Sequence, residues 1–106
     1  MLATMAKTTE SAQLRYVAQL AEQYGLLMHH CRDSRHCSGD AGFPDLVLLG
    51  PGGILFPELK SSGYRTPGQT TWRWALQAAG LSSPLWYPGD ERDGLVAQQI
   101  AALARA

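Results

Sequence analysis

The stretch GFPDLVLLGPGGILFPELK, residues 42–60, decides the fold of this chain. Residues 46–49 form a continuous apolar run, which is typical of a β-strand that is buried on both faces. The glycines and the proline of residues 50–53 predict a turn, and residues 54–60 again have the composition of a strand. The stretch therefore predicts a β-hairpin.

The register of this hairpin follows from the position of its turn. If residues 50–53 form the loop, Leu49 lies opposite Ile54, and further steps along both strands place Asp45 opposite Glu58. Directly opposed residues share one face of a sheet, with Cβ atoms about 4.5–5.5 Å apart, and two like charges in this position are destabilising. A divalent cation between the two carboxylates would remove that penalty.

Lys60 adds a positive charge to the same face. Side chains alternate along a strand, so Glu58 and Lys60 project to one side while the carbonyl of Leu59 lies between them. Hard oxygen ligands of this kind suit Mg²⁺, or Mn²⁺ in its place, better than zinc or copper. A cation held there can polarise a phosphoryl oxygen and help to generate hydroxide, while the ammonium orients the attacking water. The combination predicts hydrolysis of a phosphodiester.

The same residues also allow a purely structural interpretation. Glu58 and Lys60 could form an ordinary surface ion pair, and Asp45, which follows Pro44, could be the acid of a turn. Each of these structural explanations is sufficient for its residue when that residue is considered alone. The three charged residues stand together beside strongly apolar flanks, however, which favours a common function.

Signals elsewhere in the chain predict three helices and two more strands. The predicted helices cover residues 9–24, 66–80 and 90–105, and the predicted strands cover residues 26–29 and 85–87. Thr66, Pro67 and Gln69 match a capping box with proline in the first helical turn. The predicted order of elements is αβββαβα. We expect the core to include the following residues of the second half: Trp72, Trp86, Val96, Ile100 and Leu103.

Composition limits the size and the location of the protein. A chain of 106 residues with 45% hydrophobic content has room for one core, so we expect one domain over residues 1–106. Its start lacks the basic and apolar regions of a signal peptide, and no apolar run is long enough to span a bilayer. We therefore expect a cytoplasmic protein, in which Cys31 and Cys37 carry free thiols rather than a disulfide.

Net charge alone does not indicate a nucleic-acid partner. Nine basic residues balance nine acidic ones, and the formal net charge is +0. The basic residues nevertheless concentrate in the middle of the chain, where folding could gather them on one face. The arginines that could contact DNA phosphates are Arg32, Arg35, Arg65 and Arg73.

The residues around the hairpin resemble a known family. Residues 42–47, residues 58–61, Gln69 and Trp72 together resemble a VRR-NUC domain, a branch of the PD-(D/E)xK nuclease superfamily. The resemblance is greater to stand-alone bacteriophage copies, and it implies an α/β, restriction-endonuclease-like three-layer core with a central mixed β-sheet flanked by helices. The chain departs from the family at Pro57, where the family usually has a residue with a backbone donor.

The resemblance implies a metal centre. Asp45, Glu58 and the backbone carbonyl of Leu59 would hold Mg²⁺, for which Mn²⁺ can substitute, and Lys60 would act on the water. An enzyme of this kind would be a metal-dependent endonuclease.

The resemblance also implies roles in the site for two further residues. Gln69 would support the site, and Glu10 matches an acidic residue on the family's first helix that often contributes to the metal. A structural role is an equally simple interpretation of both, since an acid favours the first turn of a helix and Gln69 already serves the capping box.

The resemblance also implies a substrate. So small a domain has little surface for reading base edges, so we expect structure-specific cutting of a Holliday junction or other branched DNA. Stand-alone relatives resemble junction resolvases, in which a twofold dimer places two sites on a nearly twofold junction. Trp74 and residues 85–87 would form the homodimer contact, and a phage-encoded enzyme would act in the host cytoplasm.

Two other functions fit parts of the sequence. A small metal-binding module would use His and Cys ligands, although their spacing fits no standard zinc pattern. Those ligands would be His29, His30, Cys31, His36 and Cys37. The second alternative is a DNA-binding or assembly module with an inactive nuclease site, because a fold does not guarantee its activity. The intact acids and lysine of the hairpin favour the enzyme.

Overall fold

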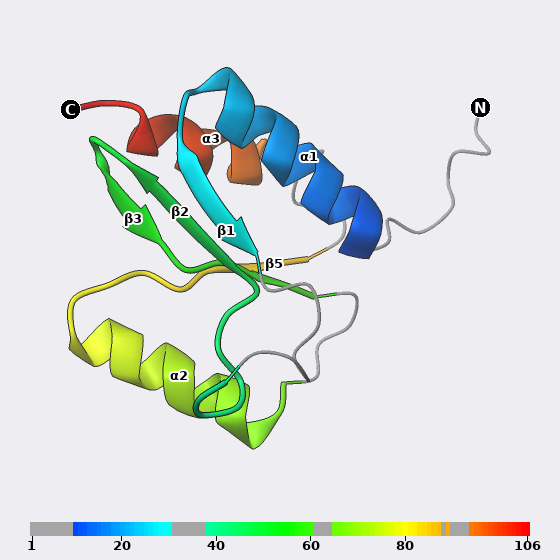
Figure 1. The fold of residues 1–106 in the computed structure, drawn as a ribbon, viewed down its shortest axis with the longest axis vertical. Helices are drawn as coiled ribbons and strands as arrows, with labels where there is room; N and C mark the ends of the chain where they lie inside the picture. Colours follow the sequence, from blue (N-terminus) through cyan, green and yellow to red (C-terminus); the bar gives the residue numbers. More distant parts are fainter. Residues whose placement is uncertain (1–9, 31–37, 61–64, 88, 90–93) are drawn as a thin grey trace.

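The computed structural model describes residues 10–30, 38–60, 65–87, 89 and 94–106 (Figure 1). Its helices and strands are α1 (Glu10–Gln23), β1 (Leu27–His30), β2 (Leu46–Gly50), β3 (Gly53–Leu55), β4 (Glu58–Leu59), α2 (Pro67–Ala78), β5 (Leu85–Trp86) and α3 (Leu95–Leu103). This order matches the predicted one, except that the third predicted strand is divided into β3 and β4.

The strands form a mixed sheet. β1, β2 and β3 are antiparallel neighbours in that order, whereas β4 and β5 run parallel. Two hydrogen bonds at the break between β3 and β4 join these parts. The amide of Leu46 donates to the carbonyl of Pro57 (3.1 Å), and the amide of Phe56 donates to the carbonyl of Ser82 (2.9 Å). The segment that contains β3 and β4 therefore lies between β2 and the β5 segment.

The register of the hairpin is the predicted one. Leu49 pairs with Ile54, and the bond from Leu46 to Pro57 continues the same pairing toward the two acids. The predicted opposition of Asp45 and Glu58 follows from this register.

Two details of the hairpin differ from the prediction. Gly50 and Gly53 pair with each other, so the turn has two residues rather than four. The strand after the turn is interrupted at Pro57, which has no N–H to donate to the carbonyl of Leu46. Because the carbonyl of Pro57 still accepts a bond from Leu46, the proline divides the strand without changing its register.

Helices cover both faces of the sheet. α1 and α3 lie together on one face, and α2 lies on the other (Figure 1). The main core fills the space between the sheet and the first of these layers, with Val17 of α1, Leu48 of β2 and Ile100 of α3 fully buried. The structure is therefore the predicted three-layer α/β fold of restriction-endonuclease type.

The alternation of side chains decides which face carries the charged residues. Leu46 and Leu48 of β2 are buried in the core with α1 and α3, so Asp45 points to the opposite face, which is the α2 face. Glu58 lies opposite Asp45, and Lys60 is two residues further along, so all three residues belong to the α2 face.

The other elements lie within their predicted ranges, apart from a one-residue shift of β1. α3 is shorter than the helix predicted over residues 90–105, and residues 90–93, like the predicted cap Thr9, lie outside the described residues. The residues predicted as core in β5 and α3 are buried, whereas Trp72 of α2 is only half-buried. None of the helices that the structure describes is long and apolar enough to cross a membrane.

Candidate active site

The carboxylate of Asp45 is fixed by the backbone of the neighbouring strand. β2 begins at Leu46, so the backbone pairing ends there, and the amide of Leu59 donates instead to Oδ2 of Asp45 (2.8 Å). Hydrogen bonds from a backbone N–H to an ionised carboxylate are among the strong ones. This bond holds the Asp45 carboxylate against β4, on which Glu58 lies.

Glu58 is a buried acid with another acid beside it. Its side chain is only 3% exposed. Burial raises the pKa of Glu58 above its ordinary value, the charge of Asp45 raises it further, and the positive charges of Lys60, Arg65 and Arg73 act in the opposite direction. The site therefore contains a carboxylate pair whose joint ionisation is disfavoured when no further cation is present.

Lys60 is held from two directions. It is 9% exposed, and its Nζ donates to Oε1 of Gln69 on α2 (3.3 Å). Its backbone amide donates to the carbonyl of Trp86 on β5 (2.9 Å). The ammonium is thus positioned by β5 through the backbone and by α2 through the side chain.

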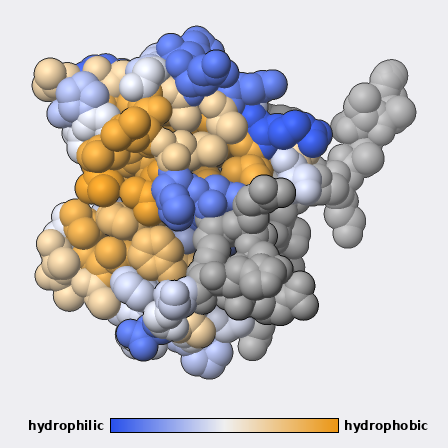
Figure 2. All heavy atoms as spheres, in the orientation of Figure 1, coloured by the Kyte–Doolittle hydropathy of each residue, from blue (hydrophilic) through white to orange (hydrophobic). Residues whose placement is uncertain are grey.

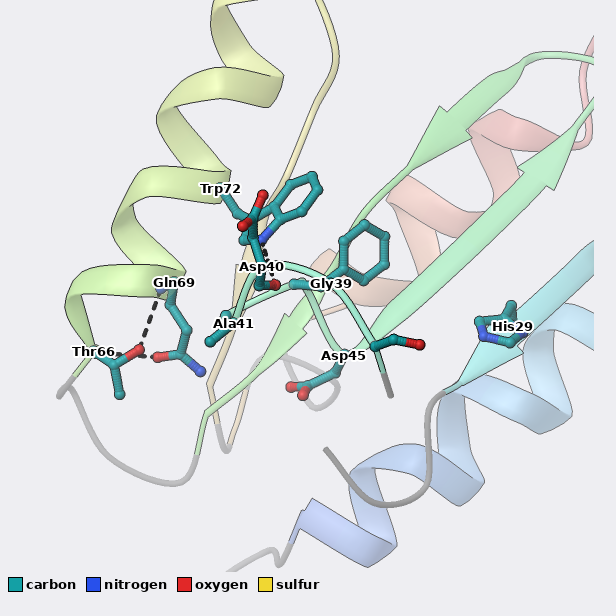
Figure 3. A pocket seen from close by; sticks show the side chains of 11 residues that line it. His29, Gly39, Asp40, Ala41, Asp45, Thr66, Gln69 and Trp72 are labelled. Carbon is teal, nitrogen blue, oxygen red and sulfur yellow. Dashed lines mark hydrogen bonds between the residues drawn. The ribbon is translucent and has the colours of Figure 1, made fainter. Parts of the chain in front are cut away.

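Gln69 serves the capping box of α2 and also contacts Lys60. Its Oε1 accepts the backbone N–H of Thr66 (2.9 Å) as well as the ammonium of Lys60, and its own N–H donates to Oγ1 of Thr66 (3.2 Å) (Figure 3). The predicted capping box is therefore confirmed. One amide oxygen links the start of α2 to the lysine of the candidate site.

The loop before β2 is docked on the first turns of α2. Gly42 has φ +94°, and a Cβ added there would lie 2.2 Å from the carbonyl carbon of Gly68. The indole N–H of Trp72 donates to the carbonyl of Asp40 in the same loop (3.1 Å). The contacts of Gly68 and Asp40 could not be predicted from the sequence, because neither residue type in isolation signals such a long-range contact.

A pocket of about 890 Å³ lies between this loop, β1 and α2 (Figure 3). The described residues that line it are residues 38–43, His29, Asp45, Thr66, Gln69 and Trp72. Since Glu58 and Lys60 are almost completely buried, the half-buried Asp45 connects the acid pair to the pocket.

The arginines predicted to contact DNA fall into three groups. Arg65 lies near Glu58, and its buried Nη1 has no hydrogen-bond partner among the described residues. Arg73 also acts on Glu58, but its Nε donates to the carbonyl of Ser83 (2.9 Å), so it anchors α2 to the segment before β5. Arg32 and Arg35 lie outside the described residues.

The remaining candidates do not join this centre in the described part of the chain. Glu10 is the first residue of α1, and its side chain is not among those described. His29 and His30 end β1, whereas Cys31, His36 and Cys37 lie outside the described residues. No group of three or more His, Cys, Asp or Glu side chains that could hold a metal occurs among the described residues.

The donor set of the hairpin is therefore two carboxylates, with a backbone carbonyl beside them. Such a set leaves several coordination positions for water and has only oxygen ligands, which is the chemistry that Mg²⁺ and Mn²⁺ accept. The repulsion between Asp45 and Glu58 supports this interpretation, since a divalent cation compensates both charges.

The comparison with solved structures supports the fold. Neither a protein-family model nor a curated protein matches the chain. Among solved structures, one described as a "VRR_NUC domain protein" superposes with a TM-score of 0.64 at 22% sequence identity, and the match covers 91% of this chain and 91% of that chain. The chain has the fold of this VRR_NUC domain protein, as the resemblance around the hairpin predicts.

Proposed function

We propose that this protein is a metal-dependent deoxyribonuclease that hydrolyses phosphodiester bonds. One observation carries the proposal: Asp45 and Glu58 face each other across the hairpin, and Lys60 lies beside them on the same face. The fold shared with the VRR_NUC domain protein supports it.

Asp45, Glu58 and the carbonyl of Leu59 would hold Mg²⁺. In an antiparallel pair, the N–H and the C=O of one residue point to the same neighbouring strand. The N–H of Leu59 points to Asp45, so its carbonyl is directed to the same side of β4. Three oxygens from two adjacent strands can then approach one cation, with waters as the remaining ligands.

Each side chain has a distinct task in the proposed reaction. Mg²⁺, when bound, would polarise the phosphoryl oxygen and lower the pKa of a coordinated water. Lys60 would orient the attacking water and balance the charge that develops on the phosphoryl group. Gln69 would act as a positioning residue, because it holds the ammonium through Oε1.

Arg65 would bind the phosphate next to the one that is cut. Its guanidinium lies close enough to Glu58 to lower that residue's pKa, and Nη1 has no partner among the described residues. Guanidinium groups suit phosphate oxygens because of their planar set of donors. Arg73 would contribute mainly through its charge, since its Nε is used by Ser83. Arg32 and Arg35 remain proposed phosphate contacts.

Branched DNA and a homodimer are part of the proposal. Trp74 on α2 is 65% exposed, which supports a contact through this helix. Trp86 of β5 is buried, so any contribution of β5 to a dimer would come from its strand edge. Figure 2 shows further hydrophobic residues gathered over β2 and β3. A monomeric mass by light scattering at the working concentration would contradict the dimer.

A cleavage assay tests the proposal. Holliday junction, flap and plain duplex substrates are incubated side by side with Mg²⁺ or with EDTA, using the wild-type chain, Glu58→Gln and the exposed control Glu22→Gln. We expect cutting only with Mg²⁺, its loss in Glu58→Gln alone, and faster cutting of branched substrates. DNA binding without cutting under any condition would instead identify a non-catalytic DNA-binding module.

A further inference from the structure

The pocket beside Asp45 has no task in the reaction described above. Asp45 is one of its lining residues, so the pocket opens beside the acid pair (Figure 3). Its volume of about 890 Å³ is within the range of about 300–1,000 Å³ that is usual for ligand pockets.

The carboxylates of the described lining favour a neutral group over a phosphate that is not bound to a cation. This described lining contains the carboxylates Asp40 and Asp45 but no lysine or arginine. A phosphate would be repelled by both acids, and it would find no strong cationic donor among these residues. A neutral, flat group that is attached to the phosphate backbone meets no such repulsion.

Phe43 offers a surface for a flat group. Its side chain is 41% exposed, although it lies only two residues before Asp45. Trp72 and Phe56 meet its ring nearly at right angles, with centroid distances of 4.9 Å and 6.2 Å and interplanar angles of 87° and 89°. These edge-to-face contacts fix the orientation of the Phe43 ring, and neither aromatic neighbour stacks on it in parallel.

We propose that this pocket binds an unpaired nucleobase of the DNA strand being cut, stacked on Phe43. The inference rests on the proposed nuclease function and specifies its substrate: DNA with at least one unpaired nucleotide beside the cut bond. Within a duplex both faces of a base are covered by its neighbours, so a base can stack on a protein ring only after leaving the helix. Stacking on an aromatic side chain tolerates any base, because every base has a π-face.

A binding experiment tests this inference without any cleavage. Fluorescein-labelled DNA that contains a short single-stranded gap and the matching complete duplex are titrated with protein in EDTA, and Kd is read from anisotropy. We expect Phe43→Ala to weaken binding of the gapped DNA by about 5–150-fold and to leave duplex binding unchanged. Phe43→Tyr should retain the wild-type preference, and Tyr24→Ala, an exposed aromatic directly after α1 and outside the pocket, should have no effect on it.

Abasic sites in the gap provide a second measurement that needs no protein variant. With wild-type protein they should reproduce the loss seen for Phe43→Ala, even if that variant folds poorly. Equal weakening of gapped and duplex DNA by Phe43→Ala, or indifference of the wild type to abasic sites, would overturn the inference. A protein that prefers unpaired bases but cuts no substrate with Mg²⁺ would overturn the nuclease proposal and leave the base pocket standing.

Discussion

Replacing Glu58 by glutamine should stabilise the metal-free protein at neutral pH. Glutamine keeps the size of the buried side chain but removes its charge, and with it the repulsion from Asp45. At a separation of about 5 Å and an effective dielectric constant of about 20, two like charges repel by about 3 kcal/mol. Lys60, Arg65 and Arg73 offset part of this energy. We therefore expect a net gain of about 1–2 kcal/mol, or an increase in Tm of roughly 5–10 °C.

The pH dependence of this gain has a defined sign. The folded-state pKa of Glu58 lies above the ordinary glutamate value of 4.5, so the folded protein binds a proton more tightly than the unfolded chain does. Stability from this group is fully present below pH 4.5 and is lost as the pH rises through the folded-state pKa. The advantage of Glu58→Gln should therefore disappear toward acidic pH.

Mg²⁺ should reverse the order of the two proteins. A cation that binds only the folded state stabilises it by about 2.7 kcal/mol when its concentration is 100 times Kd. Wild-type protein should gain this energy, and Glu58→Gln should not. Thermal unfolding followed by circular dichroism, in EDTA and in Mg²⁺, measures both effects, with Glu22→Gln on the exposed surface of α1 as the matched control. Equal stabilisation of all three proteins by Mg²⁺, or a lower metal-free Tm of Glu58→Gln, would refute the proposed acid pair.

Three further predictions concern the surroundings of this pair. Lys60→Met should lower kcat by at least about 100-fold in single-turnover cleavage and leave the Kd for DNA, measured by anisotropy, nearly unchanged. Parallel losses of cleavage rate and DNA affinity would contradict the role of Lys60 in orienting the attacking water. Gln69→Ala should lower kcat by roughly 10–100-fold, whereas Thr66→Ala, which removes a helix cap but keeps the lysine contact, should cost about 1 kcal/mol of stability and little activity. Gly42→Ala should destabilise the fold by at least about 2 kcal/mol in urea unfolding, because φ is positive and backbone lies 2.2 Å from the new Cβ. Gly80→Ala, with φ +84° but no atom within 4 Å, should cost clearly less.

The parts of the fold that the sequence predicted are those set by local rules. The register of the hairpin follows from a turn and from alternation, and the cap of α2 follows from Thr66 and Gln69, which are three residues apart. The sequence predicted one strand through Pro57, and it revealed neither the break at this proline nor that its carbonyl would preserve the register. The turn and the alternation of side chains were therefore sufficient to predict that Asp45 and Glu58 lie opposite each other.

The parts of the site that the sequence did not predict depend on contacts between distant segments. The close approach of Gly42 and Gly68 and the bond from Trp72 to Asp40 each join α2 to the loop before β2. None of these partners is identified by residue type, because glycine, tryptophan and aspartate have many commoner roles. The packing of α2 on the sheet decides which of them meet.

In the proposed enzyme, the hairpin would bind the metal, whereas α2 and the loop before β2 would select the substrate. The proposed metal ligands lie on the hairpin and are positioned by backbone pairing, so they should persist in any variant that keeps the sheet. The pocket and the contact to Lys60 need α2 and its docked loop as well. Weakening that docking, as in Gly42→Ala, should therefore reduce the preference for unpaired bases more than it reduces Mg²⁺ binding. Loss of both properties in equal measure would show that the metal centre itself requires α2.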